Sequence, residues 1–356
     1  MIKAIDTDAL TGIDKAESYL KSTLDLLDEG EKLPSMRDIK NSCGVGQSAI
    51  ERVIARMVAD GQVVAKPRSG YYKGLDQGRR TEILIFEALP DAHSTIYYRN
   101  FFNHMTKELV SNKRQIRLNE MFNQPPSCWY DGLQNGPEQT LITFRLKMDD
   151  VHIINRIKES NVPCLHVLPN FAEYIGPTIT IDDEELVRTQ LEYLTSLGHR
   201  KIGYFHWVED RKQSRARTQR LDAFCSMAIQ MGLEVKPHYV CSIGNHGENA
   251  GKAVKAWNEA GDRPTALVIY DEHVKQVYEA LYTSNILPGK DIAVLGTNDC
   301  PWTRFTSPAL SSARVCLDSL GRELINSLKA LEHGSDPGYK SLDIKIIERD
   351  STFGLD

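Results

Sequence analysis

Between residues 83 and 296 the chain alternates short apolar runs with helix-length segments whose apolar residues recur at helical spacing. Two parallel strands cannot be joined by a tight turn, so a helix usually carries the chain back between them. The alternation therefore predicts an α/β fold of parallel sheets covered by helices. The seven runs are 83–89, 114–121, 140–144, 163–168, 201–206, 266–270 and 292–296.

Polar and aromatic residues follow these runs, and they are the first candidates for a binding site. Parallel strands place their carboxyl ends at one edge of the sheet, where such sheets bind ligands. Aromatic rings stack on the apolar faces of a sugar, while charged and amide groups bind its hydroxyls. We therefore expect a sugar or sugar derivative as the ligand. The candidates are His93, Ser94, Tyr97, Arg145, Trp207, Asp271 and Asn298, together with Trp302.

Some conspicuous side chains have a structural interpretation as well. Trp207 and Trp302 suit either stacking in a ligand cleft or packing within a lobe. Trp257 lies in a periodic helical run and is expected in the core. His199 belongs to a Gly-His-Arg turn that joins a helix to a strand, so we expect it to be structural.

The first eighty residues predict three helices instead of an alternation. Apolar residues at helical spacing predict a first helix over 13–27, which Gly30 ends. Ser35 and Asp38 have the spacing of a capping box and open a second helix, which ends at Gly44. The third helix after this glycine has one apolar face. Its other face carries Gln47, Ser48, Glu51, Arg52 and Arg56.

Two β-prone runs follow, at 63–65 and 71–72, around the basic tip Lys-Pro-Arg-Ser-Gly at 66–70. Residues 31–80 contain ten Lys and Arg against five Asp and Glu, in a chain of net charge −5. Two helices about a glycine turn, followed by a basic hairpin, form a winged helix-turn-helix whose third helix can enter a DNA major groove. We expect residues 8–74 to bind DNA.

The segments LPSMRDIK, GVGQSAIERVI and DGQVVAKPRSGYY resemble the GntR family of regulators over about 65 residues. The resemblance implies that Arg37 binds backbone phosphate, that Gln47 and Ser48 lie at the groove, and that Gly70 lets the wing approach DNA. Gln47 and Glu51 stand where the family has arginines, so base preference is not carried over. The candidate DNA contacts are Ser35, Arg37, Gln47, Ser48, Arg52, Arg56, Arg68, Ser69 and Gly70.

The third helix also carries two side chains that each have two possible roles. Glu51 either caps the helix with Ser48 or accepts from a cytosine amino group. Arg56 is either a solvated charge or a reader of DNA.

Beyond residue 81 the chain resembles the effector-binding half of the LacI/GalR repressors, a fold shared with periplasmic sugar-binding proteins. The matching segments are ITIDDEELVRTQLEYLTSLGHRKIGYF (179–205), RLDAF (220–224), IAVLGTND (292–299), SPALSSAR (307–314), DSLGRELINSLKALEHG (318–334) and ERDST (348–352). The resemblance implies two lobes joined by three crossovers near 176–180, 306–311 and 335–341, with the ligand between them.

By the same resemblance, Arg220 corresponds to the family arginine that binds ligand hydroxyls. The alternative interpretation is that Arg220 is a surface arginine on a helix. Asn298 stands where the family usually has a sugar-binding aspartate, which leaves the identity of the sugar open. Tyr270 replaces a common asparagine beside Asp271.

These patterns predict a multidomain chain: an N-terminal winged helix-turn-helix plus an α/β periplasmic-binding-protein-like domain of type I with two parallel-sheet lobes. The winged helix is expected over 8–74, a linker over 75–81, and the effector-binding and dimerisation domain over 82–356. We expect the first lobe over 82–177 and 310–336, and the second over 178–309 and 340–356.

No nucleophile set, metal-ligand spacing or phosphate-binding loop accompanies these patterns, so neither an enzyme nor a cofactor is expected. The seven cysteines are scattered and include no C-x-x-C pair, which fits a reduced cytosol. No export signal or membrane span is evident in the sequence. We expect a cytoplasmic protein.

The sequence thus predicts a DNA-binding transcriptional regulator, a repressor, controlled by a small-molecule effector. A homodimer would place two heads on an inverted-repeat operator. Release of DNA by the effector is the expected sign, and the opposite sign stays open. The alternative is a cytosolic sugar-binding or sugar-modifying protein without DNA function.

Overall fold

The computed structural model describes residues 11–355 except for 29, 60–61, 68, 75–79, 86–94, 122–138, 148–150, 171–173, 207–214 and 245–246. The chain divides into two compact units, residues 1–80 with 113–115 and residues 81–112 with 116–356. Among the helices of the described residues, none is long and apolar enough to cross a membrane.

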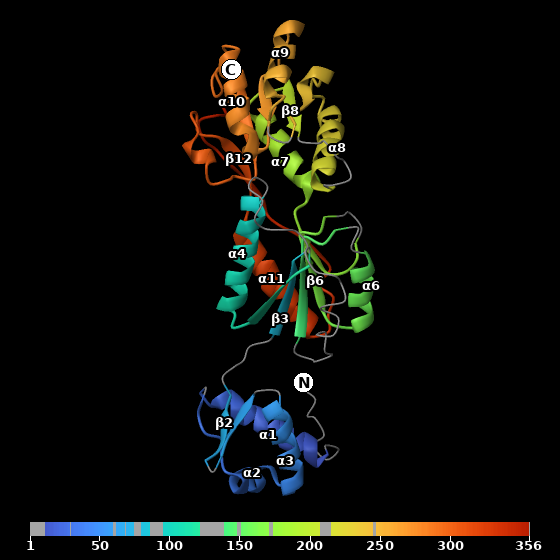
Figure 1. The fold of residues 1–356 in the computed structure, drawn as a ribbon, viewed down its shortest axis with the longest axis vertical. Coiled ribbons are helices and arrows are strands. Elements are labelled where there is room, and N and C mark those ends of the chain that lie inside the picture. Colours follow the sequence, from blue (N-terminus) through green and yellow to red (C-terminus); the bar gives the residue numbers. More distant parts are fainter. Residues whose placement is uncertain are drawn as a thin grey trace, which may run out of the picture. The chain divides into compact units, whose positions relative to one another are not determined.

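The first unit contains three helices followed by an antiparallel hairpin (Figure 1). Its elements are α1 (Gly12–Leu26), α2 (Met36–Cys43), α3 (Gln47–Ala59), β1 (Val63–Lys66) and β2 (Gly70–Lys73). The three predicted helices and the predicted hairpin are therefore confirmed.

Local signals set the limits of α2, and burial holds the three helices together. Ser35 and Asp38 form the predicted capping box, and Gly44 ends the helix at φ +66°, a conformation that glycine adopts without strain. The apolar faces then pack into one small core. Its most buried members are Ala16, Leu20, Ile39, Ile50, Val53, Ile54, Met57 and Val63.

The second unit has two lobes, each built on a six-stranded sheet. The first-lobe sheet has the order β13-β7-β6-β5-β3-β4. Figure 1 shows α4 and α11 on one side of it and α6 on the other. The elements are β3 (Arg80–Ile85), α4 (Thr95–Ser111), β4 (Gln115–Glu120), β5 (Gln139–Phe144), α6 (Val151–Ser160), β6 (Cys164–Val167), β7 (Thr178–Thr180), α11 (Leu317–Glu332) and β13 (Tyr339–Ser341).

The second-lobe sheet has the order β14-β12-β11-β10-β8-β9, and only β14 runs antiparallel to its neighbour. Helices α7 and α8 pack on one hydrophobic cluster, and α9 and α10 on another. The elements are α7 (Asp183–Ser196), β8 (Ile202–His206), α8 (Arg215–Gln230), β9 (Val240–Ser242), α9 (Ala250–Ala260), β10 (Ala266–Val268), α10 (Val274–Thr283), β11 (Ala293–Thr297), β12 (Ser311–Val315) and β14 (Ile344–Ile347).

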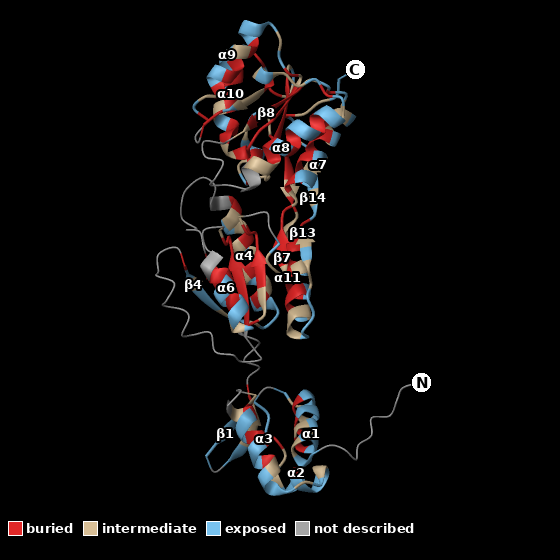
Figure 2. Ribbon diagram, turned by 90° about the vertical axis from the view of Figure 1, so that its right-hand side faces the viewer, coloured by how far each residue is buried: buried red, intermediate tan, exposed pale blue. Residues whose placement is uncertain are grey.

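Each of the seven predicted runs overlaps a strand, and Figure 2 shows why most of the runs are apolar. The central strands are buried, whereas the helices have one buried and one exposed face. This is the arrangement expected when helices cover both faces of a parallel sheet.

The predicted limits of the lobes are wrong by one strand at each crossover. Residues 178–180 pair with β6 and β13 and so complete the first lobe, whereas 311–315 pair with β11 and β14 and complete the second. Residues 339–341 pair with β7 and return to the first lobe. In each case the chain finishes a strand before it crosses. The predicted linker 75–81 also extends too far toward the C-terminus, because β3 begins at Arg80.

The separate core of the first unit gives a prediction. Ile39→Ala removes a fully buried side chain from α2 and should destabilise this unit by about 2–5 kcal/mol. Hydrogen exchange measured by mass spectrometry should speed up over residues 12–59 and stay unchanged over 183–355. Leu26→Ala, at a side chain that is 87% exposed, is the control and should change neither region. Faster exchange throughout the chain would contradict the division into two units.

Candidate functional site

The surface of the first unit predicted to contact DNA is exposed wherever it is described. The exposed members are Ser35, Arg37, Gln47, Ser48, Arg52, Arg56, Ser69 and Gly70, while Arg68 lies outside the described residues.

Two polar side chains at the starts of α2 and α3 are engaged within the unit. The Ser35 hydroxyl donates to the Asp38 carboxylate at 2.6 Å as part of the helix cap. Gln47 Nε2 donates to Glu51 Oε1 at 2.8 Å, one helical turn along. Glu51 therefore orients Gln47 and does not cap the helix through Ser48.

The arginines of this surface divide into two kinds. Arg56 forms an ion pair with Glu17 of α1, whose carboxylate also pairs with Lys21 at 2.9 Å. Hydrogen bonds from Lys21 and Arg56 lower the pKa of Glu17. By contrast, Arg37 and Arg52 make no ion pair with any residue that the structure describes, so their guanidinium groups remain available for phosphate.

The hairpin carries a basic cluster that the sequence pattern only partly predicted. The Lys66 ammonium lies 4.1 Å from the centre of the Tyr72 ring, and that of Lys32 lies 5.9 Å from it. Ser69 and Tyr72 share a hydroxyl contact of 2.5 Å. Gly70 has φ +111°, and a β-carbon there would lie 3.3 Å from Lys32 Cε. Lys32, which precedes the Leu33-Pro34-Ser35 segment, was not among the predicted DNA contacts.

A pocket lies at the carboxyl edge of the first-lobe sheet, where Arg145 and Leu168 follow their strands. Its lining residues are Tyr98, Arg145, Leu168, Pro169, Asn170, Thr180, Ile181, Asp183 and Arg220. Asp183 and Arg220 come from α7 and α8 of the second lobe. The structure therefore brings Arg145 and Arg220, which are 75 positions apart, into one pocket.

Arg145 is fixed by its neighbours on the first lobe. Its guanidinium carbon lies 4.0 Å from the centre of the Tyr98 ring, within cation–π range. Its Nη1 donates to the Leu168 carbonyl at 3.3 Å. The residue is 6% exposed and has φ +61°, an uncommon backbone conformation that occurs often at functional sites.

Arg220 forms a buried ion pair with Asp183, with Nε 2.7 Å from Oδ1. Both side chains are at most 6% exposed, and such charges are tolerated only when paired. The surface alternative for Arg220 is therefore wrong. The sequence analysis did not predict a role for Asp183 in the pocket. Its neighbour Asp182 caps α7 by accepting from Glu184 N and Glu185 N, and a helix cap accounts for an acidic residue at this position.

Two further candidates have buried polar atoms that lack a hydrogen-bond partner among the described residues, namely the Tyr97 hydroxyl and Asn298 Oδ1. Burial raises the pKa of Tyr97 well above its usual value, so its phenol stays protonated and can donate. Asn298 Nδ2 donates to Glu272 Oε1 at 3.5 Å. Buried polar atoms usually have partners, so these two atoms are candidates for contact with a ligand.

Asp271 does not reach the pocket surface, which corrects the expectation that it binds ligand. It is fully buried, and its two carboxylate oxygens accept from Cys300 N at 2.7 Å and from Ser312 Oγ at 3.0 Å. Burial raises the pKa of Asp271 well above its usual value. A residue that follows a strand can turn inward as well as outward, and Asp271 turns inward to hold the loop after β11.

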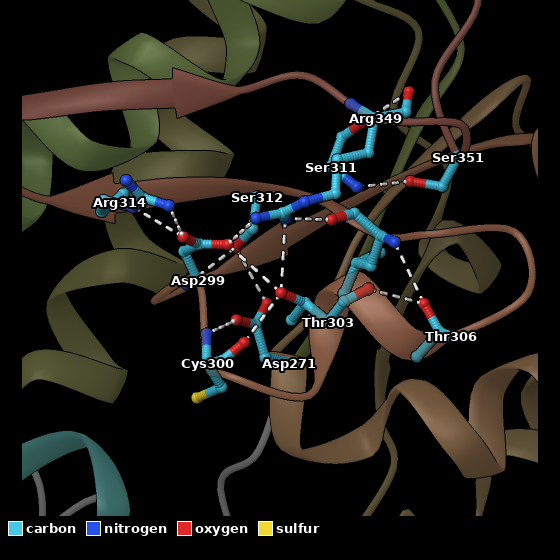
Figure 3. Close-up of polar contacts among 11 residues, drawn as sticks. Asp271, Asp299, Cys300, Thr303, Thr306, Ser311, Ser312, Arg314, Arg349 and Ser351 are labelled. Carbon is cyan, nitrogen blue, oxygen red and sulfur yellow. Dashed lines mark hydrogen bonds and ion pairs between the residues drawn. The ribbon is translucent and has the colours of Figure 1, made fainter.

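A second polar network holds the other side of that loop (Figure 3). The Asp299 carboxylate accepts from Arg314 Nε and from Arg349 Nη2, each at 2.6 Å. Ser351 Oγ accepts from Ser311 N at 2.8 Å. The SPALSSAR and ERDST segments of the sequence are therefore two sides of one network, which fixes the loop that carries Asn298.

The remaining aromatic candidates are placed as follows. Trp302 donates from Nε1 to the Asp271 carbonyl at 3.2 Å and packs against the core under α9 and α10, which favours lobe packing over ligand stacking. Trp257 is buried in that core as predicted. His93, Ser94 and Trp207 lie outside the described residues.

His199 has the predicted structural role. Its ring nitrogens contact Thr265 Oγ1 at 3.0 Å and the Phe353 carbonyl at 2.9 Å, which joins the turn before β8 to residue 353. Across the part of the chain that the structure describes, no group of three His, Cys, Asp or Glu side chains is arranged to hold a metal ion.

Comparison with known proteins identifies the fold of the larger unit. Residues 191–352 match the model of the periplasmic binding protein-like domain. The lac repressor dimer bound to operator and an anti-inducer superposes with a TM-score of 0.61 at 17% identity, over 78% of this chain and 95% of that one. This likeness establishes the two-lobed fold of the larger unit.

Curated relatives are transcriptional regulators. The probable repressor ExuR of Bacillus subtilis is 24% identical over 56% of this chain, and the regulator AscG of Escherichia coli is 20% identical over 90% of it. The chain spans 58% of the length of ExuR and 98% of that of AscG. The family model that matches lies wholly outside the first unit.

The inward position of Asp271 gives a prediction. Gly296→Ala would place a β-carbon 2.0 Å from Asp271 Oδ1 and 2.8 Å from the Leu310 side chain. Such overpacking should cost roughly 1–3 kcal/mol and lower the melting temperature. Gly251→Ala in α9, with no atom within 4 Å of the new carbon, should leave the melting temperature unchanged or raise it. Equal melting temperatures for the two variants would contradict the packing described for Asp271.

Proposed function

We propose that the protein is a transcriptional repressor whose affinity for operator DNA is controlled by a small molecule, a sugar or sugar derivative, bound between the two lobes. The observation that carries the proposal is the pairing of a lac-repressor-like two-lobed fold with a three-helix unit whose exposed face is basic. The alternative, a sugar-binding or sugar-modifying protein without DNA function, leaves the basic surface unexplained.

The first unit is proposed to be a winged helix-turn-helix of the GntR type. The α2–α3 pair about Gly44 and the following hairpin support this assignment. In the proposed complex α3 enters the major groove, with Gln47 and Ser48 at the bases. Arg37 and Arg52, together with Lys32, Lys66 and Arg68 at the hairpin, bind phosphates.

The effector is proposed to bind at the pocket that contains Arg145 and Arg220. The Tyr97 hydroxyl can donate to the ligand and Asn298 Oδ1 can accept from it, and both atoms are buried without a protein partner in the described residues. Hydroxyl groups, which both donate and accept, satisfy such a pair. The ligand changes DNA affinity only through its different affinities for the two lobe arrangements.

The active form is proposed to be a cytoplasmic homodimer on an inverted-repeat operator, assembled through the larger unit. A two-fold dimer places its two heads on two half-sites, which mirrors the symmetry of the DNA. No enzymatic step is proposed.

The salt dependence of DNA binding tests the proposed head. Arg37→Ala should remove one phosphate contact and lower the slope of log K against log salt by about 0.9. Arg56→Ala is the matched control, because Arg56 pairs with Glu17, and it should change the slope much less. Fluorescence anisotropy with a labelled duplex measures both. If the whole protein shows no salt-dependent DNA binding, the repressor proposal fails.

The effector site is tested by removing one hydroxyl. Thermal-shift screening with pentoses, hexoses, deoxy-sugars and their phosphates identifies a ligand, because a ligand that binds only the folded state raises the melting temperature. Tyr97→Phe should then weaken that ligand about tenfold without lowering the melting temperature of the free protein, since no protein partner is lost.

Tyr278→Phe is the control for this hydroxyl. The Tyr278 hydroxyl donates to the Pro308 carbonyl at 3.2 Å, away from the pocket. This variant should lower the melting temperature of the free protein and leave ligand affinity unchanged. Equal affinities of wild type and Tyr97→Phe would remove Tyr97 from the site.

A further inference from the structure

A second cavity, of about 390 Å³, lies in the first lobe, away from the pocket described above. Val162 and Pro163, which precede β6, and Pro177, which precedes β7, line it. It therefore lies at the amino edge of the first-lobe sheet, whereas the pocket with Arg145 lies at the carboxyl edge. Its volume is within the range of small-molecule sites.

The cavity has an apolar wall, formed mainly by residues on the α6 side of the first-lobe sheet. The α6 side of the sheet carries the cluster that includes Ile154, Ile157 and Val162, with Ile175 packed at its edge. Leu331, near the end of α11, completes the wall. Burial of an apolar ligand surface against this wall would favour binding, because apolar surface is removed from water.

His166 supplies a buried polar group at the cavity. The residue is 4% exposed, and its Nδ1 contacts the Thr143 hydroxyl at 2.8 Å. Its other ring nitrogen, Nε2, has no hydrogen-bond partner among the described residues, and a β-carbon on Gly176 would lie 3.5 Å from it. Burial lowers the pKa of His166 to about 4, so the ring is neutral at pH 7. When the Thr143 hydroxyl donates to Nδ1, Nε2 carries the proton.

The charges at the cavity are asymmetric. Lys158, in the last turn of α6, lines the cavity and makes no ion pair with any described residue. Among the described lining residues the one carboxylate is Asp336. It is already engaged, since it accepts from Gly338 N at 2.7 Å and from the Tyr174 hydroxyl at 3.3 Å. A ligand therefore meets an available ammonium, a ring nitrogen and an apolar wall.

We propose that this cavity is a second small-molecule site, which takes a compact ligand with an apolar body and one carboxylate. The carboxylate pairs with the Lys158 ammonium and accepts from His166 Nε2, while the body packs against Ile154, Ile157 and Leu331. Such a site is independent of the proposed repressor function and of the sugar pocket.

Matched probes on the full-length protein test the proposal. The probes are 3-phenylpropionate and hexanoate, each paired with its primary amide, and isothermal titration calorimetry measures their affinities. Each carboxylate should bind about tenfold more tightly than its amide, because only the carboxylate pairs with an ammonium. Equal affinities for acid and amide, or no binding of either carboxylate, would overturn the proposal.

Two variants locate the binding. Lys158→Gln changes an exposed side chain and should leave the fold intact, weaken the carboxylates about tenfold and abolish the preference over the amides. Lys107→Gln on α4, outside the lining, is the matched control and should change nothing. Unchanged carboxylate binding in Lys158→Gln would refute the site.

The two sites are distinguished by Tyr97→Phe. This variant should bind phenylpropionate with wild-type affinity. Lys158→Gln should bind the sugar with wild-type affinity. Loss of phenylpropionate binding in Tyr97→Phe would mean that the probe occupies the sugar pocket, which would overturn the second site without affecting the repressor proposal.

Discussion

The candidate effector pocket depends on the buried ion pair between Asp183 and Arg220. Neither charge would be stable alone in so buried a position, and each makes the burial of the other possible. Asp183 is the first residue of α7, which begins just after the chain crosses from β7 into the second lobe. The pair therefore fixes the point at which that crossover enters the second lobe, and it holds the Arg220 guanidinium at the pocket wall.

Much of the fold was predictable because apolar runs mark buried parallel strands. The strands that the pattern missed are short or polar. β7 is Thr-Ile-Thr, and β12 opens with Ser311 and Ser312, which are fully buried but satisfy their hydroxyls within the lobe. Buried serines of this kind do not differ from loop serines in sequence. The lobe limits were misplaced for the same reason, since β7 and β12 lie at the crossovers.

The candidate site was predicted in part. Arg145 and Arg220 lie together as expected: Arg145 follows β5 at the carboxyl edge of the first-lobe sheet, whereas Arg220, on α8 of the second lobe, was expected there only from the family resemblance. Asp271 was misjudged because its direction depends on Ser312, 41 residues later, and on Cys300 N, which no local pattern reveals. Arg56 offers a similar lesson: its partner Glu17 is on a different helix, so an exposed arginine on the predicted DNA face has an intramolecular role.

The network around Asp299 also affects the order in which parts of the chain can fold during synthesis. Val294 on β11 exchanges two hydrogen bonds with Ser351, and Arg349 holds the loop between β11 and β12. During synthesis β11 therefore emerges long before the residues that complete it. The second lobe reaches its native hydrogen bonding only after residue 351 has left the ribosome. The three helices and the hairpin of the first unit end at Lys73, so they can fold while the rest is still being translated.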